Sequence, residues 1–144
     1  MKIEVLCMCY NSEHFIKQVI CSWRKIGEVF IYIDNKTDDK TEEIVRNLGI
    51  IPEFFTFTTF SASRNYVLSK HTNQEVYRIF IDDSYILIGN HGSFKRELIK
   101  RNDTAISIKI LKDSEFVTYS KITKSPAKYE GIVHEYINIS PSYQ

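Results

Sequence analysis

The sequence predicts a single α/β domain with a mixed, mainly parallel sheet flanked by helices. Apolar, strand-like runs alternate with amphipathic, helix-like segments over the first two thirds of the chain, which is typical of right-handed βαβ units. The last third reads as successive strands and indicates antiparallel pairing. The length of 144 residues suits one hydrophobic core, so residues 1–144 are interpreted as one domain.

The first elements follow from local periodicity. Residues 2–9 form a mostly apolar run that predicts a buried strand. Residues 12–26 carry apolar side chains at helical spacing, and Asn11 or Ser12 is available as the N-cap. Residues 29–33 are β-branched or aromatic and predict a second strand.

The middle of the chain continues this alternation. Residues 41–48 predict a helix with acidic residues in its first turn, and Gly49 is a suitable stop. Residues 53–60 have the composition of a strand, and Ser61 is a candidate cap for a short helix that follows. The apolar run 76–81 predicts a fourth strand. The remaining elements are expected to be a helix over 93–100 and strands over 105–111, 115–122 and 131–139.

Composition excludes several classes of function. The net charge of +1, without a run of Lys or Arg, gives no electrostatic basis for a nucleic-acid partner. Three cysteines without Cys-x-x-Cys spacing predict free thiols, with Cys7 and Cys9 on one face of the first strand. The N-terminus lacks a signal-peptide pattern and no run is long enough to cross a membrane, so a cytoplasmic location is expected. His14, His71 and His91 do not cluster and are expected on the surface.

Polar residues follow the predicted parallel strands at the points where these strands end. Ligands of open α/β sheets bind at that edge. A tyrosine there can stack on a base, Asp34 can accept the imide N–H of a pyrimidine, and Arg64 can offset phosphate charge. An acid pair can hold a divalent ion that bridges two phosphates. The candidates are Tyr10 and Asn11, Asp34, Ser61 with Arg64 and Asn65, and Asp82 with Asp83.

Five segments in this order resemble the family 2 glycosyltransferases of GT-A fold. They cover nearly the whole chain: VLCMCYNSEHFIKQVICSW, IYIDNKTDDKTEEIV, FSASRNYVL, YRIFIDDSYIL and YEGIVHEYI. The resemblance implies a GT-A-like fold and the inverting transfer of a sugar, UDP-linked by preference, from a nucleoside diphosphate to a hydroxyl. It implies a glycan, lipid or protein as the acceptor, and other domains if the chain belongs to a longer glycosyltransferase.

The resemblance also implies roles for individual residues. Donor-binding positions would be Tyr10, Asn11, Asp34, Asp39, Arg64, Asn65 and Asp82. A divalent metal, Mn or Mg, would be held by Asp82, Asp83 and His134, and Glu135 and Asp83 would be the catalytic carboxylates, with Glu135 as general base. Simpler interpretations stay open: Asp39 as a helix cap, Arg64 as a solvated helix residue, Tyr10 as an ordinary strand-end aromatic and His134 as a structural histidine.

One departure from the family pattern leaves two interpretations of the function open. The family usually has Asp-x-Asp, and here Ser84 stands where the second acid belongs. Serine is a poor substitute for a charged oxygen ligand, so either Asp83 ligates instead or the metal is held weakly. The alternative to an enzyme is therefore a degenerate glycosyltransferase domain that binds a nucleotide or a protein without turnover.

Overall fold

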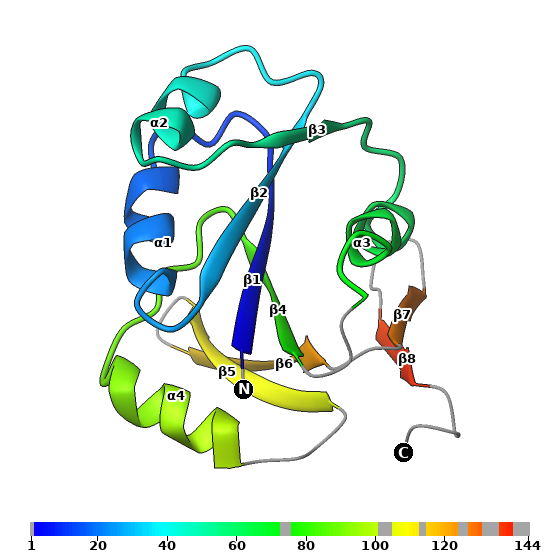
Figure 1. Ribbon diagram of the computed structural model, residues 1–144. Coiled ribbons are helices and arrows are strands. Elements are labelled where there is room, and N and C mark those ends of the chain that lie inside the picture. Colours follow the sequence, from blue (N-terminus) through cyan, green and yellow to red (C-terminus); the bar gives the residue numbers. More distant parts are fainter. Residues whose placement is uncertain are drawn as a thin grey trace.

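The computed structural model describes residues 2–72 and 76–100 in full, and the backbone of four further strands. Figure 1 shows the elements, coloured from blue at the N-terminus to red at the C-terminus. They are β1 (Lys2–Cys9), α1 (Ile16–Trp23), β2 (Glu28–Asp34), α2 (Thr41–Asn47), β3 (Glu53–Phe55), α3 (Phe60–Leu68), β4 (Val76–Asp82), α4 (His91–Lys100), β5 (Ala105–Lys112), β6 (Glu115–Thr123), β7 (Ala127–Glu130) and β8 (Tyr136–Ile139).

The main sheet has the order β3-β2-β1-β4-β6-β5. Its first four strands run parallel, while β6 pairs antiparallel with both β4 and β5. β7 and β8 form a separate antiparallel pair. The predicted division into a parallel part and an antiparallel last third is therefore confirmed.

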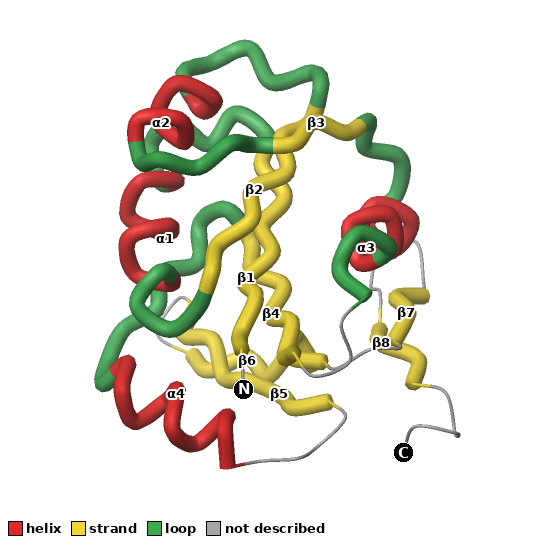
Figure 2. The backbone as a smooth tube through the Cα atoms, viewed as in Figure 1, coloured by secondary structure: helices red, strands yellow, loops and turns green. Residues whose placement is uncertain are grey.

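Helices cover the parallel strands on both faces. Figure 2 shows α1 and α2 on one side of β1 and β2, and α3 on the other. Alternation along β1 separates the two cores: Val5 and Cys7 pack on the α1 side, and Leu6 packs on the α3 side. On the α1 face β1 approaches the α1–β2 turn closely, because a Cβ on Gly27 would lie 2.4 Å from the carbonyl oxygen of Ile3.

The cysteines behave as the sequence predicts. All three are free, and Cys7 and Cys9 are buried on the same face of β1 with their Sγ atoms 3.8 Å apart. The hydrogen bond with Cys9 and burial both raise the pKa of the Cys7 thiol, so it stays protonated at neutral pH. Cys21 is exposed on α1.

Helix α1 begins four residues later than the predicted start at Ser12. The amides of Phe15 and Ile16 donate to the carbonyl of Ser12 at 3.1 and 3.0 Å, but no side chain caps the helix. Both predicted caps are used elsewhere: Asn11 Oδ1 accepts from the Asp38 amide, and the Ser12 hydroxyl donates to Asp83. Tertiary contacts have replaced the local cap.

The predicted strand 53–60 is shorter in the structure. β3 ends at Phe55, which lies opposite Asp34, the last residue of β2. β3 is an edge strand, so it has no partner beyond that point and leaves the sheet. Thr59, rather than Ser61, then caps α3, because its side chain accepts from the Ala62 amide at 3.1 Å.

In the last third, the predicted strand 131–139 corresponds only in part to the structure. β8 covers Tyr136–Ile139, and β7, which was not predicted, precedes it. Residues 131–135 lie outside the described part of the chain.

The prediction that His71 lies on the surface is wrong. It is 8% exposed, and its Nε2 lies 2.6 Å from the Tyr32 hydroxyl. Its Nδ1 lies 3.3 Å from Glu4 Oε2, and its ring meets Phe30 edge to face. His71 follows α3 in a loop, where no periodic pattern marks its burial, and it fills the space between that loop and the sheet.

Candidate functional site

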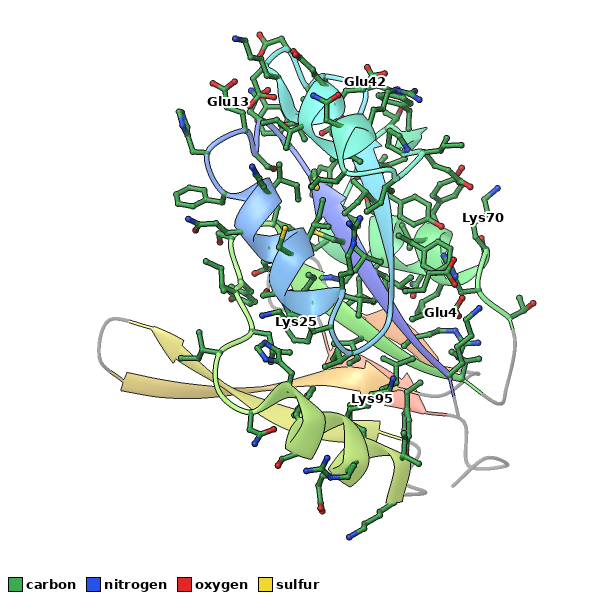
Figure 3. All side chains as sticks on the ribbon, turned by 60° about the vertical axis from the view of Figure 1, so that its left-hand side comes forward. Glu4, Glu13, Lys25, Glu42, Lys70 and Lys95 are labelled. Carbon is green, nitrogen blue, oxygen red and sulfur yellow. The ribbon has the colours of Figure 1, made fainter. Side chains whose placement is uncertain are left out.

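The parallel sheet has its switch point between β1 and β4. From β1 the chain passes through α1 to β2 on one side, whereas α3 leads to β4 on the other. The helix that follows β1 and the helix that precedes β4 thus cover opposite faces of the sheet, and ligands of open α/β sheets bind at the carboxyl ends of strands at such a point. Figure 3 shows Glu13 near this end of the sheet and Glu4 toward the opposite end.

The β1–α1 loop carries the first predicted residues. Tyr10 is 55% exposed, as a ring available for stacking must be. Asn11 adopts a left-handed backbone with φ of 47°, which asparagine tolerates better than most residues. Its Oδ1 accepts from the Asp38 amide at 2.9 Å and ties this loop to the β2–α2 loop.

Asp34 ends β2 and is 8% exposed. Its Oδ1 accepts from the Lys36 amide at 3.1 Å, which forms a local turn. Its backbone carbonyl accepts from the Thr37 amide at 2.9 Å. The other carboxylate oxygen, Oδ2, accepts no hydrogen bond from the described residues, so it remains available to a donor on a ligand.

Asp39 acts as a brace between two loops. Its Oδ1 accepts from the Thr41 amide at 2.9 Å and from the Thr41 hydroxyl at 2.6 Å, and its Oδ2 accepts from the Glu13 amide at 3.1 Å. Burial acts to raise the pKa of Asp39, but these hydrogen bonds outweigh it and hold the pKa below its ordinary value. Asp39 thus binds the first amide of α2 from one residue before the N-cap position, which Lys40 occupies.

Arg64 and Asp82 meet across the α3 face. Arg64 is 4% exposed, and its guanidinium nitrogen lies 3.3 Å from Asp82 Oδ1. The guanidinium also lies over the rings of Phe60 and Phe80, 5.5 and 5.9 Å from their centroids. The interpretation of Arg64 as a solvated helix residue is therefore wrong. Asn65 is the next residue on α3 and is half-buried.

Asp83 points toward the β1–α1 loop. Its Oδ2 accepts from the Ser12 hydroxyl and, at 3.4 Å, from the Tyr10 amide. Sequence reasoning placed Tyr10 and Asp83 at this edge but missed Ser12, which is 3% exposed. Its signal was masked because a serine before a helical segment is the usual pattern of an N-cap.

The segment after the acid pair is fastened to α1. The Tyr85 amide donates to the Asp82 carbonyl at 3.1 Å and closes a turn. Trp23 Nε1 donates to the Tyr85 carbonyl at 2.8 Å, and the Leu87 amide donates to Ser22 Oγ at 3.0 Å. These two contacts hold residues 85–87, beyond the acid pair, against the C-terminal end of α1.

The residues predicted to hold a metal are brought together only in part. Asp82 and Asp83 are adjacent, and each keeps one carboxylate oxygen that accepts no hydrogen bond from the described residues. Among the described residues no group of three His, Cys, Asp or Glu side chains is arranged to hold a cation. Two carboxylates suit a hard cation that takes its other ligands from phosphate oxygens and water. His134 and Glu135 lie outside the described residues.

No helix within the described residues is both long enough and apolar enough to span a bilayer.

Comparisons with known proteins give matches in structure only. No family model and no curated protein sequence matches the chain. The segment 1–349 of S. aureus TarS, a glycosyltransferase, superimposes with a TM-score of 0.54 at 20% identity, over 69% of this chain and 32% of that one. The same segment solved with UDP and with UDP-GlcNAc gives TM-scores of 0.53 at 20% identity, over 69% of this chain and 31% and 30% of those chains.

The chain thus spans about a third of the length of the TarS segment, at 32%. At 20% identity the likeness is one of fold. The protein has a GT-A-like glycosyltransferase fold.

Proposed function

We propose that the chain is the nucleotide-sugar-binding part of a glycosyltransferase that resembles family 2. The observation that carries this proposal is that Tyr10 and Asp34, which follow β1 and end β2, lie at the same edge of the sheet as Arg64, Asp82 and Asp83. The first pair suits a base, and the second group suits a diphosphate.

The donor in this proposal is a uridine diphosphate sugar. The exposed ring of Tyr10 offers a stacking surface, and the available oxygen of Asp34 can accept the imide N–H of uracil. The TarS structures solved with UDP and UDP-GlcNAc support this donor class, because they share the fold.

We further propose that Asp82 and Asp83 hold a divalent cation, Mn or Mg. When bound, such an ion neutralises charge on the leaving diphosphate. The chain's own contribution is the orientation of the two carboxylates: Arg64 holds Asp82, and the β1–α1 loop holds Asp83. Arg64 also adds a fixed positive charge beside the diphosphate position.

The transfer itself is proposed to be inverting. An acceptor hydroxyl on a glycan, lipid or protein forms the new bond to the anomeric carbon, and the bond to the diphosphate oxygen breaks with its electron pair. The hydroxyl proton passes to a carboxylate, for which Glu135 is proposed as general base beside His134.

A second candidate function is nucleotide or protein binding without turnover. The observation that favours it is the engagement of Asp83 Oδ2 by Ser12 and Tyr10, with Ser84 in the place of a second acid. A carboxylate that braces a loop contributes one oxygen fewer to a cation.

The test is thermal unfolding with nucleoside diphosphates and their sugars, each with and without Mn²⁺. We expect UDP to raise the Tm and Mn²⁺ to enlarge the shift, since a ligand at one hundred times its Kd adds about 2.7 kcal/mol. Inorganic pyrophosphate with Mn²⁺ controls for chelation alone. If none of the nucleotides raises the Tm, the proposal is wrong.

Two further measurements separate the candidate functions. Release of UDP from a UDP-sugar in the presence of a hydroxyl acceptor, lost in Glu135→Gln, supports the enzyme. Binding of UDP without turnover supports the binding module. Asp83→Asn should abolish the effect of Mn²⁺ on binding while Ser84→Ala leaves it intact; if neither changes it, the assignment of the metal to Asp83 is wrong.

A further inference from the structure

Ser12 lies where three loops of the candidate site meet. Its amide donates to Thr41 Oγ1 at 2.8 Å, and its hydroxyl donates to Asp83 Oδ2. The hydroxyl also lies 3.3 Å from the Tyr10 carbonyl, but the carboxylate is the closer and charged acceptor. Ser12 is 3% exposed and Thr41 is fully buried, so the bond between them is shielded from water, whereas Asp83 is half-buried.

The hydrogen bonds continue on both sides of Ser12. The Thr41 hydroxyl donates to Asp39 Oδ1 at 2.6 Å, and the Tyr10 amide donates to Asp83 Oδ2 at 3.4 Å. The result is a continuous chain from the start of α2, through the β1–α1 loop, to the end of β4. We call Asp39, Thr41, Ser12, Asp83 and Tyr10 the Ser12 relay.

We propose that Ser12 is a positioning residue for the nucleotide diphosphate, acting through Asp83 on both the stacking ring of Tyr10 and the acid pair. The inference rests on the proposed function and deepens it. It assigns a role to a side chain that the donor and metal assignments above do not use.

Few contacts hold the Tyr10 ring and the Asp83 carboxylate in place. The Tyr10 ring is largely exposed, so its place is set mainly by its backbone, and the 3.4 Å bond to Asp83 is long. The Ser12 hydroxyl donates to Asp83 Oδ2, and this bond also sets the direction in which Asp83 Oδ1 points. Without the hydroxyl, the carboxylate can rotate and the loop loses its second anchor to β4.

Ser22 provides a matched control. It is also a buried serine on the same connection, 8% exposed, with its Oγ donating to the Val19 carbonyl at 2.9 Å and accepting from the Leu87 amide. It lies at the other end of α1, away from the carboxyl ends of the strands. Ser22→Ala therefore removes comparable buried hydrogen bonds without touching the relay.

The experiment measures the Kd of UDP with and without Mn²⁺ by calorimetry on the full chain. We expect Ser12→Ala to raise the Kd about tenfold and to reduce the gain from Mn²⁺, whereas Ser22→Ala changes the Tm but neither binding quantity. Thr41→Val should reproduce part of the loss, and Thr41→Ser, which keeps the hydroxyl, should retain binding. Equal Kd values and equal Mn²⁺ effects in Ser12→Ala and Ser22→Ala would overturn the inference.

A double-mutant cycle separates this inference from the proposed function. If Ser12 acts through Asp83, then Ser12→Ala adds little to the loss of binding caused by Asp83→Ala, and the two changes also fail to add in urea unfolding. Additive losses of binding overturn the inference while UDP binding by the wild type still supports the proposed function. A wild type that binds no nucleotide overturns both, whatever the unfolding cycle gives.

Discussion

Arg64 and Asp82 form an ion pair of 3.3 Å that joins α3 to the carboxyl end of β4. The two partners differ in exposure, since 5% of the Arg64 side chain and 39% of the Asp82 side chain are exposed. The Arg64 guanidinium is thus a buried cation that lies over two aromatic rings, and its carboxylate partner is the group open to solvent.

Arg64→Met is therefore expected to weaken UDP binding about tenfold and uridine binding little, because only UDP presents phosphates to the guanidinium. Arg64→Lys should recover part of the loss, since it keeps the charge but not the planar stacking group. Arg46→Met, in an exposed pair with Glu42, is the control and should leave both ligands unaffected. Equal losses of affinity for uridine and UDP would contradict the placement of Arg64 beside the phosphates.

Asp34 is expected to set the choice between uracil and cytosine. Uracil presents an N–H donor at its N3 position and cytosine presents an acceptor there, so a carboxylate acceptor favours uracil. Asp34→Asn, which can donate as well as accept, should reduce the preference for UDP over CDP by about 1–3 kcal/mol. The ratio of the two Kd values measures this, and Asp38→Asn, on the exposed loop, is the control. An unchanged ratio contradicts the assignment.

Asp39 should contribute stability that depends on pH. Its pKa is lower in the folded chain than in the unfolded chain, so the contribution is fully present above the unfolded pKa, about 3.9, and is lost as the pH falls through the folded value. The Tm of wild type should exceed that of Asp39→Asn at pH 6, and the gap should be smaller at about pH 3, below the unfolded pKa. A gap of the same size at both pH values would show that the charge of Asp39 is not involved.

The contact between Tyr32 and His71 should be worth a measurable part of the folding free energy. Burial raises the pKa of Tyr32 and keeps its hydroxyl protonated. Tyr32→Phe leaves His71 Nε2 buried without that partner, which should cost about 1–2 kcal/mol in urea unfolding. Tyr66→Phe, an exposed tyrosine on α3, should change the stability by less than about 0.5 kcal/mol. Equal changes in the two variants would contradict a structural role for the hydroxyl.

Sequence reasoning found what local patterns determine. Asp34 and Asp82 could be placed at the sheet edge because each directly follows an apolar strand, and the structure puts both at strand ends. The same reasoning failed where one side chain has two possible uses. Ser12 suits an N-cap and a tertiary contact equally well in sequence, and only the position of β4 decides between them.

Other failures come from interactions between distant segments. β3 ends at Phe55 because β2, its pairing partner, ends at Asp34. The aromatic sequence of residues 53–60 gives no sign of this boundary. The burial of Arg64 and His71 depends on how α3 and the following loop lie against the sheet. Charged and polar residues of this kind carry no periodic signal, so their burial appears only once the packing is known.

The central place of β1 also has a consequence for folding. Its two neighbours are far apart in the chain: Val5 lies opposite Val29 on one side and Ile79 on the other. Until β4 has been synthesised and docked, one edge of an apolar strand stays open, and open apolar edges promote aggregation. Docking of β4 therefore covers this edge of β1 and brings Asp83 to Ser12 in the same step.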